Sequence, residues 1–317
     1  MPWFDLPLEQ LREYRTTTLE PPGLDQWWAQ RIEQARAVAE PVTLTRHEPD
    51  LYAPLEVYDA EFSGARGDRI RAWYIRPAGP ARKTIVRFIG YGGGRGAPSE
   101  HALTAALGFA VLVMDTRGQG GRWTTGATGD GAPGPENSQV MTKGITNPED
   151  YYFTRLFTDA VRAVDTAAEL ADGNPVAVDG GSQGGALSLA AAALAPDKVV
   201  LCHANVPFLC DIQRAITLAP SAPFTEIPEF LNENVHLIEV ALDTLRYIDC
   251  ALLARRITAQ TLVSVGLMDE ICPPSTVFAA YNEIAAGKDI AVYPYSGHAV
   301  PHAHAEVQLR HMRKFFR

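Results

Sequence analysis

The sequence has few cysteines and no long apolar run. Its four cysteines form neither a CxxC pair nor a regular framework, so we expect reduced thiols. An uninterrupted apolar stretch of about 18 residues would predict a membrane span, and none is present. The segment Met1 to Leu6 lacks the basic region and apolar run of a secretory signal. These absences together predict a cytoplasmic protein.

The sequence also has no excess of basic residues. It carries 28 Lys and Arg against 37 Asp and Glu, which gives a formal net charge of −9 at pH 7. This charge argues against a nucleic-acid partner and against binding to anionic membrane surfaces. Hydrophobic residues make up 46% of the 317 residues and charged residues 21%, which are ordinary globular values. The length suits one large α/β domain or two small ones, and no internal repeat is present.

Apolar segments of strand length alternate with segments of helical periodicity along most of the chain. Strand, helix and strand in close succession predict a parallel sheet with right-handed crossovers. We therefore predict an α/β fold with a mostly parallel, twisted sheet and helices on both faces. Strands are predicted at residues 57–62, 70–76, 84–89, 110–115, 176–179, 199–204, 261–266 and 290–294, and helices at 25–40, 102–107, 147–170, 186–195, 275–286 and 303–316.

Three segments depart from this alternation. Residues 1–22 are polar and contain several prolines, which predicts an irregular arm. Residues 116–147 are rich in Gly, Thr, Pro and Asn and predict a long loop of the kind found at active sites or interfaces. Helical segments fill residues 207–256, between two predicted strands, and we expect this insertion to cover the site. We assign residues 1–317 to a single domain, with the arm and first helix within about residues 1–40.

The pattern Gly180-x-Ser182-x-Gly184 lies between an apolar strand and an Ala- and Leu-rich helix. It is the pattern of a nucleophile elbow, in which a serine occupies a strained strand-to-helix turn. Glycines flank such a serine because a Cβ would clash there. The following helix would point backbone N–H groups at the place where an oxyanion develops. The alternative is a glycine-rich turn without chemistry.

A serine hydroxyl becomes a useful nucleophile only with a base within reach, and the base needs an acid that orients it. In an α/β-hydrolase fold the three residues come in the order serine, acid, histidine, and the last two follow later strands. Asp269 follows the strand that ends at Gly266, and His298 follows the strand that ends near residue 294. Ser182, Asp269 and His298 therefore satisfy residue type, order and topology, and we predict them as the catalytic triad.

Each member of this set has competitors. Glu270 stands beside Asp269, and Asp115 also ends a strand but precedes the serine. His302 and His304 compete with His298, and the three histidines could instead hold a metal. Pro301 interrupts the helix that such a metal site would need, so we expect no metal and no other cofactor.

Two backbone N–H groups are expected to form an oxyanion hole. One belongs to Gln183, which follows the nucleophile, and the other to Tyr91 in the loop after an early strand. The run Gly90-Tyr91-Gly92-Gly93-Gly94 could also indicate phosphate binding, but no Lys-Ser or Lys-Thr follows it. The other alternative is a flexible glycine hairpin.

Three motifs together resemble the acetyl xylan esterase / cephalosporin C deacetylase family (carbohydrate esterase family 7). They are Arg117-Gly118-Gln119-Gly120, Gly180-Gly181-Ser182-Gln183-Gly184-Gly185 and the stretch from Gly266 to Ser275. The resemblance implies an α/β-hydrolase with Ser182 as nucleophile, Asp269 as acid, His298 as base and an oxyanion hole from Tyr91 and Gln183. It also implies that Arg117 and Gln119 hold loops near the site.

The resemblance implies a homo-oligomer, a hexamer, that removes acetyl groups from xylo-oligosaccharides, other acetylated sugars and cephalosporin C. One position departs from the family pattern, because Ala299 stands where glutamate usually follows the histidine. We expect this change to affect the loop or the oligomer more than the reaction. Alternative functions are a general short-chain carboxylesterase, a small peptidase-like hydrolase and a non-catalytic binding protein with the same fold.

Overall fold

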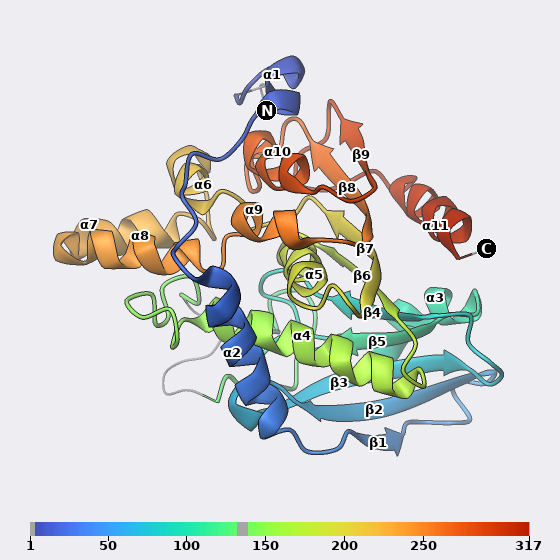
Figure 1. Cartoon of the computed structure of the whole chain (residues 1–317). Helices are drawn as coiled ribbons and strands as arrows, with labels where there is room; N and C mark the ends of the chain where they lie inside the picture. Colours follow the sequence, from blue (N-terminus) through green and yellow to red (C-terminus); the bar gives the residue numbers. More distant parts are fainter. Residues whose placement is uncertain (1–3, 132–138, 317) are drawn as a thin grey trace.

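The computed structural model describes residues 4–131 and 139–316, and one twisted sheet runs through the middle of the molecule (Figure 1). Over these residues nine strands lie in the order β1-β2-β3-β5-β4-β6-β7-β8-β9. Their bounds are β1 (Thr43–Arg46), β2 (Leu55–Ser63), β3 (Arg69–Pro77), β4 (Thr84–Phe88), β5 (Ala110–Met114), β6 (Val176–Gly181), β7 (Val199–Asn205), β8 (Gln260–Gly266) and β9 (Lys288–Tyr293).

The sheet has an antiparallel end and a parallel body. Strands β1, β2 and β3 pair antiparallel, and β3 pairs antiparallel with β5. From β5 through β4, β6, β7 and β8 to β9, every pairing is parallel. In this body Val86 pairs with Val178, and both side chains are buried because helices cover both faces. The mostly parallel sheet of an α/β-hydrolase fold, predicted from the sequence, is confirmed.

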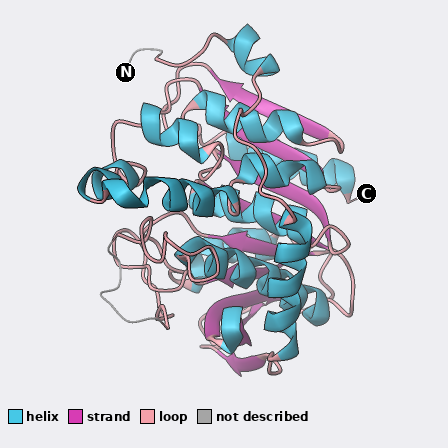
Figure 2. Cartoon of the chain, turned by 60° about the vertical axis from the view of Figure 1, so that its left-hand side comes forward, coloured by secondary structure: helices cyan, strands magenta, loops and turns pink. Residues whose placement is uncertain are grey.

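Helices lie on both faces of this sheet (Figures 1 and 2). Helices α2, α4, α5, α9 and α10 contribute to the large core on one face, whereas α3 and α11 belong to two smaller clusters on the other. The helices are α1 (Leu8–Glu13), α2 (Leu24–Ala37), α3 (Ala102–Ala106), α4 (Tyr152–Leu170), α5 (Gln183–Leu194), α6 (Ile212–Leu218), α7 (Glu226–Glu233), α8 (Ile238–Arg246), α9 (Cys250–Leu253), α10 (Pro274–Glu283) and α11 (His304–Phe315).

Helix α2 is anchored by Trp28. The indole is 1% exposed, stacks against Phe157 of α4 and donates from Nε1 to the Tyr247 carbonyl at 2.8 Å. Truncating a buried aromatic residue of this size to alanine costs about 3 to 5 kcal/mol. Trp28 therefore fixes the N-terminal part of the chain against α4.

Several boundaries differ from the predictions. The arm predicted as irregular contains α1, and its first three residues lie outside the described part. Strand β1 was not predicted, because all four of its residues are exposed and show no buried face. Helix α2 begins after Gly23, whose φ of 71° suits glycine, so Asp25, the predicted first residue, lies inside the helix and contacts Arg256. Helix α4 begins at Tyr152, several residues after the predicted start at residue 147.

The structure contains the long loop predicted at residues 116–147 and the helical segment predicted at residues 207–256. The described residues of segment 116–147 contain turns and bends, and residues 132–138 of that prediction lie outside the described part. Helices α6 to α9 follow β7 and precede β8, and α7 and α8 project from the body of the molecule (Figure 1). None of the helices in the described part is long and apolar enough to cross a membrane.

Candidate active site

Ser182 lies in the sharp turn between β6 and α5. Its φ of 58° and ψ of −118° are strained for a residue with a side chain. A Cβ on Gly180 would lie 2.4 Å from the carbonyl carbon of Gly184, and one on Gly184 would lie 2.4 Å from the carbonyl oxygen of Phe88. The two glycines of the motif are therefore needed for the close approach of β4, β6 and α5 around the serine.

Asp269 and His298 contact each other at the carboxyl ends of β8 and β9. His298 Nδ1 lies 2.9 Å from Asp269 Oδ2, and the Asp269 side chain is fully buried. The backbone N–H groups of Ile271 and Cys272 donate to Asp269 Oδ1, each at 2.9 Å. An ionised carboxylate only accepts hydrogen bonds, so Nδ1 carries the hydrogen and Nε2 is left as the basic nitrogen.

The two loops that carry this pair are joined by backbone hydrogen bonds. The N–H of Leu267 donates to the Tyr293 carbonyl, and that of Met268 donates to the Ser296 carbonyl, both at 3.0 Å. A Cβ on Gly266 would lie 2.3 Å from the Gly297 carbonyl oxygen, so glycine allows the loops to approach. The acid and the histidine are thus held in register by the loops themselves.

Ser182 and His298 both line a pocket of about 340 Å³. The residues around it come from the glycine-rich loop, from the loop after β5, from the segment between α6 and α7, and from the Asp269 loop. They are Gly90, Tyr91, Arg122, Trp123, Ser182, Ala222, Pro223, Ile271 and His298. The predicted nucleophile and base therefore face one small, open space.

The predicted oxyanion donors belong to the residue after the serine and to a loop that lines the same pocket as the serine. Gln183 is the first residue of α5, where N–H groups have no partner within the helix. Tyr91 lies in a turn closed by the hydrogen bond from Gly93 N to the Gly90 carbonyl at 3.1 Å. Its hydroxyl donates to Glu226 Oε1 at 2.9 Å, and its carbonyl accepts from Trp123 Nε1 at 3.0 Å. Three contacts thus fix the loop that presents the Tyr91 N–H.

Arg117 forms the centre of a buried ion network beneath these loops. Its guanidinium donates to both Asp159 oxygens, at 2.5 and 2.8 Å, and to Asp68 Oδ2 at 2.8 Å. The same group donates to the Asp130 carbonyl at 3.0 Å. Burial alone would lower the pKa of Arg117, but the Asp159 and Asp68 carboxylates raise it overall, so the side chain stays charged. Arg117 therefore holds the segment after β5 against α4 and the β2–β3 connection.

The competing residues occupy other surroundings. His304 is buried and bonds through Nδ1 to the Tyr293 hydroxyl at 2.8 Å and through Nε2 to Asn205 Oδ1 at 2.7 Å. Burial lowers the pKa of His304, which suits a neutral ring in a structural role. Asp115 Oδ1 and Oδ2 accept from backbone N–H groups of the loops, including Arg95 and Ala127. The Asp269 carboxylate, beside Glu270 in sequence, is the one that contacts His298.

Sequence reasoning missed several residues around the pocket. Trp123 is 60% exposed beside Ser182, and Arg122 lies over the Tyr91 ring at 5.5 Å. A tryptophan in a glycine-rich loop directly after the Arg117 motif was the available signal. Of the apolar residues in the 207–256 insertion, Pro223 lines the pocket, whereas Phe208 and Phe224 are buried against each other in the core.

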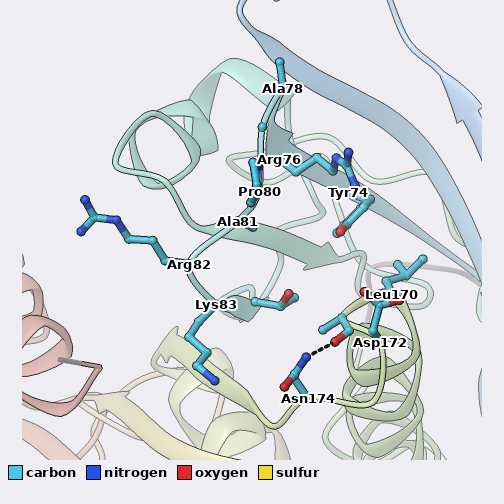
Figure 3. A pocket seen from close by; sticks show the side chains of 13 residues that line it. Tyr74, Arg76, Ala78, Pro80, Ala81, Arg82, Lys83, Leu170, Asp172 and Asn174 are labelled. Carbon is cyan, nitrogen blue, oxygen red and sulfur yellow. Dashed lines mark hydrogen bonds between the residues drawn. The ribbon is translucent and has the colours of Figure 1, made fainter.

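A larger cavity of about 570 Å³ lies near the amino ends of β4 and β6, whereas Ser182 follows the carboxyl end of β6 (Figure 3). It is bounded by Thr84 at the start of β4, the loop before it and the end of α4. Arg76 at its rim pairs with Glu56 at 2.7 Å, and the Arg82 side chain points away from the other labelled residues (Figure 3). Its lining residues include neither a serine nor a histidine, so the smaller pocket at Ser182 is the better candidate active site.

The sequence and the fold both resemble those of known esterases. The acetyl xylan esterase (AXE1) family model matches residues 1–315. Acetyl xylan esterase 1 of Thermoanaerobacterium sp. JW/SL YS485 is 35% identical, with a TM-score of 0.89 over 99% of this chain and 100% of that chain. The acetyl xylan esterase of Paenibacillus sp. R4 is 32% identical, with a TM-score of 0.86 over 98% and 99% of the two chains.

Among curated proteins, the acetyl esterase Axe7A of Xylanibacter ruminicola is 29% identical over 309 residues. The match covers 92% of this chain and 65% of that relative, so this chain spans slightly less than two thirds of the relative's length. The family model extends over nearly the whole sequence and both structural matches extend over nearly the whole fold. The chain therefore belongs to the acetyl xylan esterase family.

Proposed function

We propose that the protein is a serine esterase that removes acetyl groups from small acetylated substrates through an acetyl-serine intermediate. The observation that carries this proposal is the arrangement of Ser182 and of the Asp269–His298 pair around one pocket. The strained turn exposes the serine, and the buried carboxylate orients the histidine. Acetyl esterases among the relatives support the choice of the acetyl group.

The proposed reaction has two steps. Ser182 Oγ attacks the ester carbonyl while His298 Nε2 takes its proton, and the Asp269 carboxylate stabilises the imidazolium. The Gln183 and Tyr91 N–H groups hold the oxyanion. The carbon–oxygen bond to the alcohol breaks as His298 returns the proton to the leaving oxygen. Water, deprotonated by His298, then attacks the acetyl-serine and releases acetate and the free serine.

The pocket supports short acyl groups and small alcohols. Its volume of about 340 Å³ lies at the lower end of the range for small-molecule sites, about 300 to 1,000 Å³. We propose acetylated xylo-oligosaccharides, other acetylated sugars and cephalosporin C as substrates. The exposed indole of Trp123 offers an apolar face for a sugar ring beside the nucleophile.

We further propose a cytoplasmic hexamer. All four cysteines are free and buried, which suits a reducing compartment. Ala299, which replaces the usual glutamate, is exposed beside His298. A glutamate here would point away from the core of the chain, so we infer that its loss changes contacts between subunits more than the Asp269–His298 pair. Size-exclusion chromatography with light scattering tests the hexamer, and a monomer at micromolar concentration would contradict it.

Acetate release from p-nitrophenyl acetate and from an acetylated xylo-oligosaccharide tests the activity. Ser182→Ala should abolish turnover, whereas Ser296→Ala, a control on the neighbouring His298 loop, should retain it. Undiminished activity of Ser182→Ala would exclude the proposed nucleophile. A fluorophosphonate should label Ser182, and a protein that only binds acetylated ligands would not be labelled.

A series of esters with longer acyl chains separates the deacetylase from a general carboxylesterase. We expect kcat/KM to fall from acetate to butyrate because the pocket is small. A rise beyond butyrate would favour the general carboxylesterase.

A further inference from the structure

Cys272 lies in the catalytic centre, yet the proposed mechanism does not use it. Its side chain is 1% exposed, and its thiol lies near the Ser182 side chain. Ligand atoms of Asp269, Cys272 and His298 all lie within 4.8 Å of one another. Within residues 4–131 and 139–316, this is the group of acidic, cysteine and histidine side chains close enough to share a cation.

We propose that Asp269, Cys272 and His298 form an inhibitory binding site for a thiophilic divalent cation such as Zn²⁺ or Cd²⁺. Thiolate, imidazole and carboxylate are the ligands that zinc takes in proteins, and the thiolate favours soft metals over Mg²⁺ or Ca²⁺. Bond lengths of about 2.0 to 2.3 Å in a tetrahedral site place ligand atoms roughly 3.5 Å apart. Side-chain rotation that shortens the longest of these separations by up to about 1.3 Å closes the site around the metal.

The backbone holds two of the three ligands in advance. Cys272 N–H donates to Asp269 Oδ1 at 2.9 Å, so both residues belong to one hydrogen-bonded turn. The third ligand, His298, is tied to this turn through the bond from Met268 N to the Ser296 carbonyl at 3.0 Å. His298 is 31% exposed and lines the pocket, which gives a cation its path from solvent.

The charges of the ligands match a divalent cation. The Asp269 carboxylate and a Cys272 thiolate supply two negative charges, and neutral His298 supplies a nitrogen lone pair. The thiol gives up its proton to solvent as the metal–sulfur bond forms, so one proton is released for each metal bound. Because binding releases a proton, inhibition should become stronger as the pH rises.

Binding of the cation would stop turnover without unfolding the protein. The metal replaces the hydrogen bond between His298 and Asp269, so the histidine no longer has the orientation that a general base needs. Water or the hydroxyl of Ser182, which lies near Cys272, can supply the fourth ligand of a tetrahedral site. A chelator reverses the inhibition because no covalent bond to carbon has changed.

Cadmium titration of the purified, metal-free enzyme tests the site without relying on its activity. Wild type should develop the ultraviolet charge-transfer band of a cadmium–thiolate bond at one equivalent, and Cys272→Ser and Cys272→Ala should not. Cys202→Ala, which removes a buried thiol of β7 far from the triplet in sequence, should keep the band. A band that persists in both Cys272 variants, or that is absent from wild type, overturns the proposal.

Inhibition provides the second measurement. Zn²⁺ should slow fluorophosphonate labelling of Ser182 and acetate release in wild type, and EDTA should restore both. The inhibition constant should rise at least about 100-fold in Cys272→Ser and Cys272→Ala, since loss of even an outer-shell partner costs 10- to 100-fold in affinity. Equal inhibition of wild type and both variants, each relative to its own rate without metal, would refute the site.

Discussion

The side-chain amide of Gln119 donates a hydrogen bond to the side-chain carbonyl of Gln183, 2.8 Å away. The side-chain carbonyl of Gln119 in turn accepts a hydrogen bond from the backbone N–H of Gly92 at 2.6 Å. The side-chain NH₂ group of Gln119 also donates to the Tyr152 hydroxyl at 2.8 Å. Gln183 and Gly92 belong to the two segments that present the proposed oxyanion donors. One buried amide therefore links the two halves of the proposed oxyanion hole.

Gln119→Met should lower kcat on p-nitrophenyl acetate by about 10- to 100-fold while KM stays within about 3-fold. The proposed donors act mainly on the transition state, and loss of one whole donor costs about 10² to 10³, so misplacing both costs less. Gln119→Glu keeps an acceptor for Gly92 N–H and should fall between wild type and Gln119→Met. If KM rises and kcat does not fall, Gln119 acts on substrate binding instead.

Asp269→Asn should reduce kcat by about 10³- to 10⁴-fold, because the amide cannot stabilise the imidazolium and favours the wrong tautomer. Glu270→Gln is the matched control, since it removes the neighbouring carboxylate that does not contact His298 in the structure. We expect Glu270→Gln to retain more than half of the wild-type kcat. Steady-state kinetics with p-nitrophenyl acetate compares the two, and a reversed order would reassign the acid to Glu270.

The elbow could be predicted from sequence because its requirements are local. A serine with a φ of 58° needs small neighbours, and the sequence shows glycine at positions 180 and 184. The contact between Asp269 and His298 could be anticipated from topology, since both residues follow strands that turn out to be neighbours. The repeated strand and helix lengths likewise predicted the parallel body of the sheet.

Features that depend on tertiary contacts could not be predicted. Strand β1 pairs with β2, but all residues of β1 are exposed, so no apolar pattern in the sequence predicts this strand. Phe208 and Phe224 are apolar residues in the insertion, and sequence alone does not show that they pack on each other rather than on substrate. Cys272 lies near Ser182, 90 residues away in the sequence, only because the tertiary fold brings the segment after β8 next to the turn after β6.

Arg117→Met should destabilise the protein by about 3 to 5 kcal/mol, because it leaves the fully buried Asp159 carboxylate without its partner. Asp159→Asn in the same chain should recover part of this loss, since it removes the charge and keeps an acceptor for Ala65 N–H. Arg310→Met, which breaks an exposed pair with Glu306, should cost less than about 1 kcal/mol. Urea unfolding measures all three, and equal losses at Arg117 and Arg310 would contradict the ion network's role.

His203 should make the protein less stable in mild acid. Burial lowers its pKa to about 4, partly offset by Asp179, while the unfolded chain titrates near 6.5. Between these values the unfolded state binds a proton that the folded state does not, so stability falls as the pH drops from about 6.5 to about 4. About 2 kcal/mol should be lost by pH 5 through this residue.

His203→Gln removes this titration and can keep a polar contact with His311, which lies 3.0 Å from His203 in wild type. Urea unfolding at pH 8 and pH 5 should show a smaller loss in the variant than in wild type. The comparison between the two proteins is needed because Asp249 acts in the opposite direction. Burial raises its pKa to about 7, so its contribution is lost as the pH rises toward 7. Parallel pH profiles would show that His203 does not titrate as described.

Trp123→Ala should raise KM for an acetylated xylo-oligosaccharide about 10-fold, the effect of losing about 1.4 kcal/mol of contact with the sugar. Methyl acetate has no ring to stack, so its kcat/KM should change by less than about 3-fold if the indole serves as a platform. The indole also supports the glycine-rich loop through its bond to the Tyr91 carbonyl at 3.0 Å. Loss of that support would instead lower kcat for both esters.

Trp123→Phe separates the two roles, because it keeps an aromatic face and removes the Nε1 donor. If Trp123→Phe keeps a low KM for the sugar but has a reduced kcat for both esters, the ring binds the sugar and the hydrogen bond supports the loop. If both variants instead lose kcat equally and neither changes KM, Trp123 only supports the loop.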